Sequence, residues 1–252
     1  MAFQIVVDDT LLAIVQDVAA DVGYPVPPDP AGSTDPAVVQ MVTAANRAGL
    51  ELLGLYDWQE LTKSYTVSVQ AAFPGQTERA YPLPEDFYDW IDQTQWNATT
   101  QLPAIGPVSP QDWKTLIVRN LQATLSFYWQ VRDNQIYILS PPDSAQDLTF
   151  FYQSYAWVRD ADDADLYKNR ANKNGDTILL DPVLMVLLTK VKWLEIKGFD
   201  SSAAMRDFQL NFESRKASEK GAPVLNMAGR SVFPLLDARV NTPDTGYGGV
   251  GY

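Results

Sequence analysis

Two of the three Asp-Pro pairs in the chain mark positions where helices can begin. Asp35-Pro36 and Asp181-Pro182 each place a helix-capping carboxylate before a proline, the residue best tolerated in a first helical turn. Apolar residues at helical spacing follow both pairs and predict helices over 36–55 and 183–197. Between them, from Leu61 onward, the apolar period changes to two, which predicts strands.

Two further helices are expected at the flanks. Asp8 and Asp9 can cap a helix that runs to about Asp21, and a helix over 202–220 places its aromatic residues on one face. Within the strand region, Asp133-Asn134 has the residue types of a tight hairpin turn, with alternating apolar residues on both sides. The stretch from Arg159 to Thr177 is predicted to be a polar loop.

These elements predict an α+β fold: a four-helix bundle with an inserted antiparallel β-domain and an extended C-terminal arm. Residues 1–60 and 178–222 are expected to form the bundle, and 61–177 the inserted β-rich domain with its polar loop. Residues 223–252 lack a sustained period but keep apolar anchors, which are rare in a plain disordered tail. We interpret them as an arm that orders on a partner; the alternative is an extension packed on its own chain.

Small residues cluster on the helix predicted over 36–55, and they allow another helix to approach closely. That neighbour lies either within the chain or across a subunit boundary. We take forward the second alternative, a subunit-packing helix face made of Ala44, Ala45, Ala48 and Gly49.

The composition removes several classes of chemistry. The chain has no cysteine, which excludes disulfides, thiolate metal sites and cysteine nucleophiles. It also has no histidine, so triads with a histidine base and histidine-ligated zinc sites are excluded. Any chemistry would have to rest on Asp, Glu, Lys, Tyr or Ser. We expect the chain to be no enzyme and to carry neither cofactor nor metal. The net charge of −12 argues against gripping nucleic acid, although an acidic wall suits a channel through which DNA slides.

Targeting signals are not expected. No segment approaches the ~18 apolar residues of a membrane span. The first residues contain aspartates and lack the basic region of a signal peptide. The absence of cysteine fits assembly in a reducing cytoplasm.

Two acidic clusters are candidates for chemical sites. Asp160 to Asp165 has the wrong residues for a calcium loop at the glycine and bidentate positions, so a solvated acidic loop is expected. Paired carboxylates beside tryptophans could serve glycoside hydrolysis, although a polar segment with aromatic anchors is the more common meaning of such a pattern. The residues of this second cluster are Glu85, Asp86, Asp89, Asp92, Trp90 and Trp96.

The order of several short sequence runs resembles the head-to-tail adaptor proteins of tailed bacteriophages, also called tail accessory factors or connector proteins. The first half contributes Asn46-Arg47-Ala48, Tyr56-Asp57-Trp58-Gln59-Glu60-Leu61, a Thr/Ser-rich strand and Tyr81-Pro82-Leu83-Pro84-Glu85-Asp86-Phe87. The second half contributes Asp181-Pro182, a helix ending Lys192-Trp193-Leu194-Glu195-Ile196-Lys197-Gly198, and a charged helix through Phe212-Glu213. The resemblance spans roughly residues 8–222.

The resemblance implies a structural role in the virion, at the head-tail connector. Family members combine a helical bundle with a β-rich insertion and form a ring, usually of twelve copies, below the portal protein. The ring extends the DNA channel, through which DNA passes without specific binding, and it docks a downstream tail or nozzle protein. A C-terminal extension commonly reaches the portal. The corresponding arm residues here are Val232, Phe233, Leu235, Leu236, Arg239, Tyr247 and Tyr252.

Two other functions remain open from the sequence. The chain could be a phage carbohydrate-binding or glycan-hydrolysing tail protein that uses the Glu85–Trp96 cluster. It could also be a subunit of another virion or tail assembly, which only the identity of its partner would distinguish from an adaptor.

Overall fold

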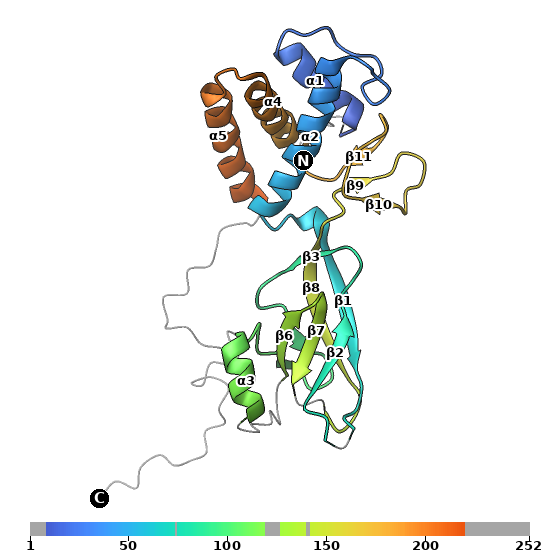
Figure 1. Cartoon of the computed structure of the whole chain (residues 1–252), viewed down its shortest axis with the longest axis vertical. Coiled ribbons are helices and arrows are strands. Elements are labelled where there is room, and N and C mark those ends of the chain that lie inside the picture. Colours follow the sequence, from blue (N-terminus) through green and yellow to red (C-terminus); the bar gives the residue numbers. More distant parts are fainter. Residues whose placement is uncertain (1–8, 74, 119–126, 140–141, 220–252) are drawn as a thin grey trace, which may run out of the picture. The chain divides into compact units, whose positions relative to one another are not determined.

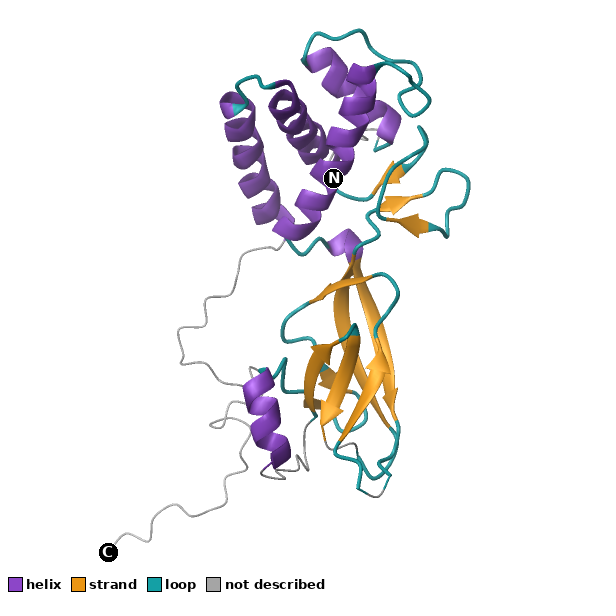
Figure 2. Ribbon diagram, viewed as in Figure 1, coloured by secondary structure: helices purple, strands orange, loops and turns teal. Residues whose placement is uncertain are grey.

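The computed structural model describes residues 9–73, 75–118, 127–139 and 142–219 (Figure 1). The fold is α+β. Its helices are α1 (Leu11–Asp21), α2 (Pro36–Leu55), α3 (Pro110–Val118), α4 (Pro182–Lys197) and α5 (Ser202–Glu219), with a 3-10 turn at Gln59–Leu61. Helices α1, α2, α4 and α5 are gathered together, and we call them, with the segment 155–181 described below, the helical body (Figure 2).

The Asp-Pro pairs act as predicted. The Asp35 carboxylate accepts a hydrogen bond from the backbone N–H of Ala37 (2.9 Å), and the Asp181 carboxylate accepts one from Leu184 (3.0 Å). Helix α4 ends at Gly198, whose φ of 73° is the left-handed conformation that glycine adopts without steric cost. Both helix starts and this helix end are confirmed.

The start of α1 differs from the prediction. Its N-cap is Thr10, whose hydroxyl accepts from the Ala13 N–H (3.3 Å). Asp8 lies outside the described residues. Asp9 is used through its backbone carbonyl, which accepts from the N–H of Ile178 (2.8 Å). The cap is therefore one residue later, because the segment before it pairs with the strand that precedes α4.

The β-domain, residues 62–154, consists of two antiparallel sheets that share one apolar core. The first sheet contains β1 (Thr62–Val69), β3 (Phe87–Trp90), β4 (Trp96–Asn97), β5 (Leu102–Pro103) and β8 (Gln146–Ser154). The second contains β2 (Glu78–Pro82), β7 (Gln135–Leu139) and β6 (Tyr128–Arg132). The predicted hairpin is confirmed: Asp133 and Asn134 have φ angles of 52° and 57° between β6 and β7.

Strands β1 and β8 connect the β-domain to the helical body. They pair without a bulge from Thr62 opposite Gln153 to Val69 opposite Gln146. Strand β1 leaves the helical body after α2, and β8 returns to it (Figure 1). Both ends of the insertion therefore lie side by side, which keeps the helical body continuous around it.

The segment after β8 belongs to the helical body, whereas the sequence assigned residues up to 177 to the inserted domain. Trp157, Val158, Ala171 and Ile178 are all buried in the same apolar cluster as α1, α2 and α4. The segment forms a small sheet of β9 (Val158–Arg159), β10 (Tyr167–Lys168) and β11 (Thr177–Ile178). Its few apolar anchors lie far apart along a polar sequence, so no periodicity could reveal that they are buried.

Gly49 of α2 is required by the packing of Trp157. A Cβ atom at this position would overlap the Cη2 and Cζ2 atoms of that indole, which is fully buried. We expect Gly49→Ala to lower the free energy of unfolding by about 1–3 kcal/mol, because overpacking outweighs the gain in helix propensity. Urea denaturation followed by tryptophan fluorescence measures this change.

Gly54→Ala is the matched control on the same helix. A Cβ there would lie 3.2 Å from the Tyr88 hydroxyl, the far end of a half-exposed side chain that can shift. We expect unchanged or slightly higher stability for this variant. Equal stability of Gly49→Ala and wild type would contradict the close approach of α2 to Trp157.

Candidate functional site

The predicted arm falls outside the described residues. This applies to Val232, Phe233, Leu235, Leu236, Arg239, Tyr247 and Tyr252, since the description ends at 219. Their role in binding a portal stays a prediction.

The small residues of α2 lie in the chain's own core. Ala44, Ala45 and Ala48 are at most 1% exposed, and Gly49 is buried against Trp157. A face that is already covered within the protomer has no surface left for a second subunit. The subunit-packing face predicted at these four residues is therefore wrong. The other alternative, close packing within the chain, is what the structure has, because α4 and the segment after β8 cover this side of α2.

A buried ion cluster lies in the segment between β9 and β11. The Asp176 carboxylate is fully buried and accepts from Lys168 Nζ at 2.7 Å. It also accepts from three backbone N–H groups, those of Ala161, Asn172 and Lys173. Asp160, only 7% exposed, binds Lys168 at 2.7 Å and Lys173 at 2.8 Å. The stretch from Asp160 to Asp165 was expected to be a solvated acidic loop. Its first residue, Asp160, is instead buried and paired within this ion cluster.

These contacts favour the ionised form of the Asp160 and Asp176 carboxyl groups over the protonated form. Lys168 and then Lys173 donate to Asp160 and hold the pKa of its carboxyl far below the ordinary value. For Asp176, burial acts to raise the pKa, but the hydrogen bonds from Lys168, Asn172 and Lys173 outweigh it and the pKa is lowered. Both carboxylates are therefore charged at neutral pH, where they hold the segment's two lysines.

This cluster also determines where α1 begins. The backbone carbonyls of Asp176 and Asn174 accept from the first two N–H groups of α1, those of Leu11 and Leu12, at 3.0 and 3.1 Å. N–H groups at a helix start have no partner within the helix, so the loop supplies it. The Asn174 side chain further bonds Asp29 (2.6 Å) and the Ala31 N–H (2.9 Å) in the proline-rich loop before α2. The cluster has a positioning role.

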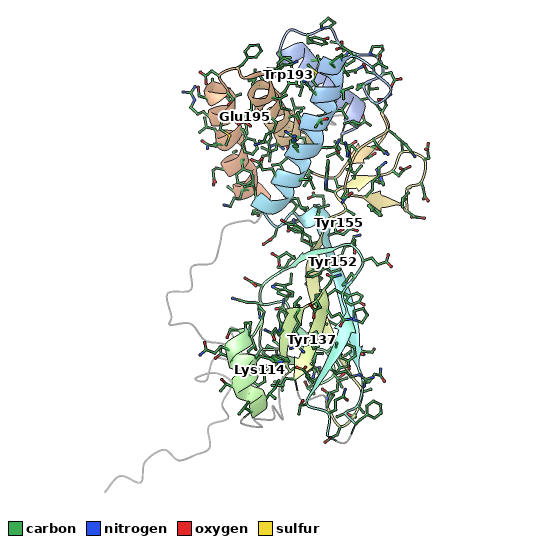
Figure 3. The ribbon with its side chains drawn as sticks, in the orientation of Figure 1. Lys114, Tyr137, Tyr152, Tyr155, Trp193 and Glu195 are labelled. Atoms are coloured by element: carbon green, nitrogen blue, oxygen red, sulfur yellow. The ribbon has the colours of Figure 1, made fainter. Side chains whose placement is uncertain are left out.

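A second cluster lies where the β-domain meets the helical body. Asp86 accepts from Lys63 Nζ at 2.6 Å and from the hydroxyls of Tyr152 and Ser154 at 2.7 Å each. Lys63 Nζ also lies 4.9 Å from the centroid of the Tyr167 ring in β10. Figure 3 labels Tyr152 and, close by, Tyr155, which packs on the helical core. The Asp86 cluster therefore joins β1, β8 and β10 at one point.

The Asp86 cluster has the wrong properties for a glycosidase acid. Burial acts to raise the pKa of Asp86, yet the bonds from Lys63, Tyr152 and Ser154 prevail and lower it. A general acid needs a raised pKa to keep its proton near neutrality. All three donors are side chains of the protein itself, so the carboxylate stabilises the junction between the β-domain and the helical body.

Metal binding finds no support in the described part of the chain, which contains no group of three acidic side chains arranged to hold an ion. Within the same residues, every helix is too short or too polar to cross a bilayer.

The clusters around Asp176 and Asp86 were not found from the sequence. The hydrogen bonds to Asp86 join residues up to 68 positions apart, and those to Asp176 lie in a polar segment without an apolar period. One weak signal existed: Lys63 is the only charged residue of an otherwise polar and apolar strand, and such a residue needs a partner.

The sequence matches no protein family model and no curated protein.

The Asp176 cluster makes stability depend on pH. Because the pKa of Asp176 is lower in the folded than in the unfolded chain, where it is near 3.9, its contribution is present above about pH 4 and is lost as the pH falls below it. We expect Asp176→Asn to unfold with about 2 kcal/mol less free energy at pH 7 and to lose less further stability between pH 5 and pH 3 than wild type does. Urea denaturation across this pH range measures both effects.

Asp162→Asn is the control, since the Asp162 side chain is 79% exposed and its one ion pair among the described residues is with Lys173. Its stability at pH 7 should stay within about 0.5 kcal/mol of wild type. If the two variants behave alike, burial of the Asp176 carboxylate has no energetic consequence.

Proposed function

We propose that the protein is a structural head-to-tail adaptor of a tailed phage, one subunit of a ring below the portal that extends the DNA channel and docks the next tail component. The observation that carries the proposal is the architecture. A helical body built from both halves of the chain holds an inserted two-sheet β-domain on the paired strands β1 and β8. This is the arrangement that the sequence resemblance implies.

The state of the polar residues also supports a structural role. The two best candidate sites, around Asp176 and Asp86, use their carboxylates to fix one segment of the chain on another. Each makes several internal bonds and has its pKa lowered. Groups held in this way stabilise a geometry, which is what an assembly subunit requires of its polar residues.

The charge of the chain fits a channel wall. With a net charge of −12, the average surface repels phosphate groups, so DNA would slide past without a specific contact. Screening limits this repulsion to about 8 Å at physiological salt, so it acts only on DNA that passes close to the wall. The proposed partners are copies of the same chain, a portal protein and a tail or nozzle protein.

Electron microscopy of the purified chain, alone and mixed with the portal complex of its phage, tests the proposal. We expect rings, twelve-fold in the family pattern, that stack coaxially on the portal. A chain cut after residue 222 should still form rings but lose the portal, because it lacks the apolar arm anchors Val232, Phe233, Leu235 and Leu236.

Two outcomes would count against the proposal in different ways. Unchanged portal docking by the shortened chain would refute the arm as the contact and leave the ring standing. A monomer that ignores the portal would refute the adaptor itself. A peptidoglycan hydrolysis assay comparing wild type with Glu85→Gln would then test the glycan alternative.

A further inference from the structure

Helix α2 has one uncovered face, on the side opposite its buried alanines. Four residues spaced by one helical turn lie on it: Val39, Thr43, Arg47 and Leu50. Val39 and Leu50 are 47% and 53% exposed, and the Thr43 hydroxyl donates to the Val39 carbonyl at 2.8 Å. No carboxylate of the described residues forms an ion pair with Arg47. The face is therefore apolar, with a single positive charge near its centre.

Helix α5 has an uncovered face as well. Phe208 points into the core, and the opposite side presents Ala203, Asp207 and Leu210. Leu210 is 65% exposed, and Phe199, just before the helix, is 60% exposed. Within the part of the chain that the structure describes, no basic side chain pairs with Asp207. This face combines an exposed leucine with the acidic Asp207, and the exposed Arg206 and Glu213 lie one turn before and after Leu210.

The two faces match in the spacing of one charged and one apolar residue. Arg47 precedes Leu50 by three positions, and Asp207 precedes Leu210 by the same three. If the helices lie parallel in this register, one further pair follows at the same offset. The resulting contacts are Thr43 with Ala203, Arg47 with Asp207, and Leu50 with Leu210.

We propose that these faces form the contact between neighbouring copies of this chain, with α2 of one copy parallel to α5 of the next. A ring needs two different faces on one subunit, so that each copy offers one face to each neighbour. The proposal rests on the ring of the proposed function and names the surfaces that close it.

The direction of the helices agrees with this geometry. Within one chain α2 and α5 run the same way (Figure 1), and the Trp58 ring, just after α2, lies with its centroid 6.4 Å from that of Phe212 in α5. Rotation about an axis along these helices keeps the helices of neighbouring copies parallel. A helix pair buries less than the roughly 800 Å² per partner of a typical stable interface, but ring closure gives every subunit two such contacts.

Charge reversal in the full-length chain tests the contact, with ring formation followed by sedimentation velocity and electron microscopy. Arg47→Glu and Asp207→Arg should each convert the ring to monomer, because each places like charges together. The double variant, Arg47→Glu with Asp207→Arg, should restore the ring. Circular dichroism should show all three folded, since neither residue has an internal ion pair among those described.

Lys114→Glu is the matched control, because it makes the same change of charge on the exposed side of α3 in the β-domain. It should leave the ring intact. Loss of the ring in this control, or intact rings in both single variants, would overturn the α2–α5 contact. A wild-type chain that forms no ring would instead refute the proposed function.

The absence of cysteine permits a second test of the register. An equal mixture of Leu50→Cys and Leu210→Cys chains should yield disulfide-linked dimers on mild oxidation, whereas each variant alone should not. Cross-linking of Leu50→Cys with itself would indicate a two-fold contact between α2 helices and overturn the head-to-tail arrangement.

Discussion

The contact between Trp157 and Gly49 of α2 is the constraint on which the rest of the molecule depends. Trp157 is the third residue after β8, so its indole enters the helical core at the point where the chain returns from the insertion. Only a residue without a side chain at Gly49 lets α2 come this close. The backbone carbonyl of Trp157 then accepts from the Leu179 N–H, which guides the chain toward α4. One aromatic contact thus connects both halves of the body.

The ionic clusters complete what this apolar contact begins. Asp176 holds the loop that starts α1, and Asp86 joins β1 and β8 to the small sheet of the body through Lys63. In both clusters the carboxylate exchanges its bonds to water for several charge-assisted or backbone hydrogen bonds. A poorly hydrated carboxylate is tolerated only when such bonds compensate for the lost water. Such joints favour one arrangement of the connected segments, because a satisfied polar network specifies a single geometry.

The sequence predicted most of the helices and the central hairpin because their signals are local. Asp35, Asp181 and Gly198 act on neighbouring N–H or carbonyl groups, and Asp133-Asn134 on its own turn. The partner of the alanine face of α2 was predicted wrongly, because small residues indicate close packing but not which element packs there. The boundary after β8 was placed too late, because the apolar anchors of the following segment lie far apart along a polar sequence. The bonds to Asp86 join residues 23 to 68 positions away, so they depend on the fold and not on any nearby pattern. Those to Asp176 join residues at most 15 positions away, but they lie in a polar segment that has no apolar period.

The insertion of the β-domain between adjacent strand ends has a consequence for how such a chain can change. Thr62 and Gln153 face each other across the β1–β8 pair, where backbones lie only about 5 Å apart. The inserted domain between these two residues therefore acts as a closed loop attached to the helical body. The entropy of closing a loop grows only slowly with its length. The inserted domain can therefore lengthen, shorten or be exchanged at little cost to the body, so the two parts are free to diverge at different rates.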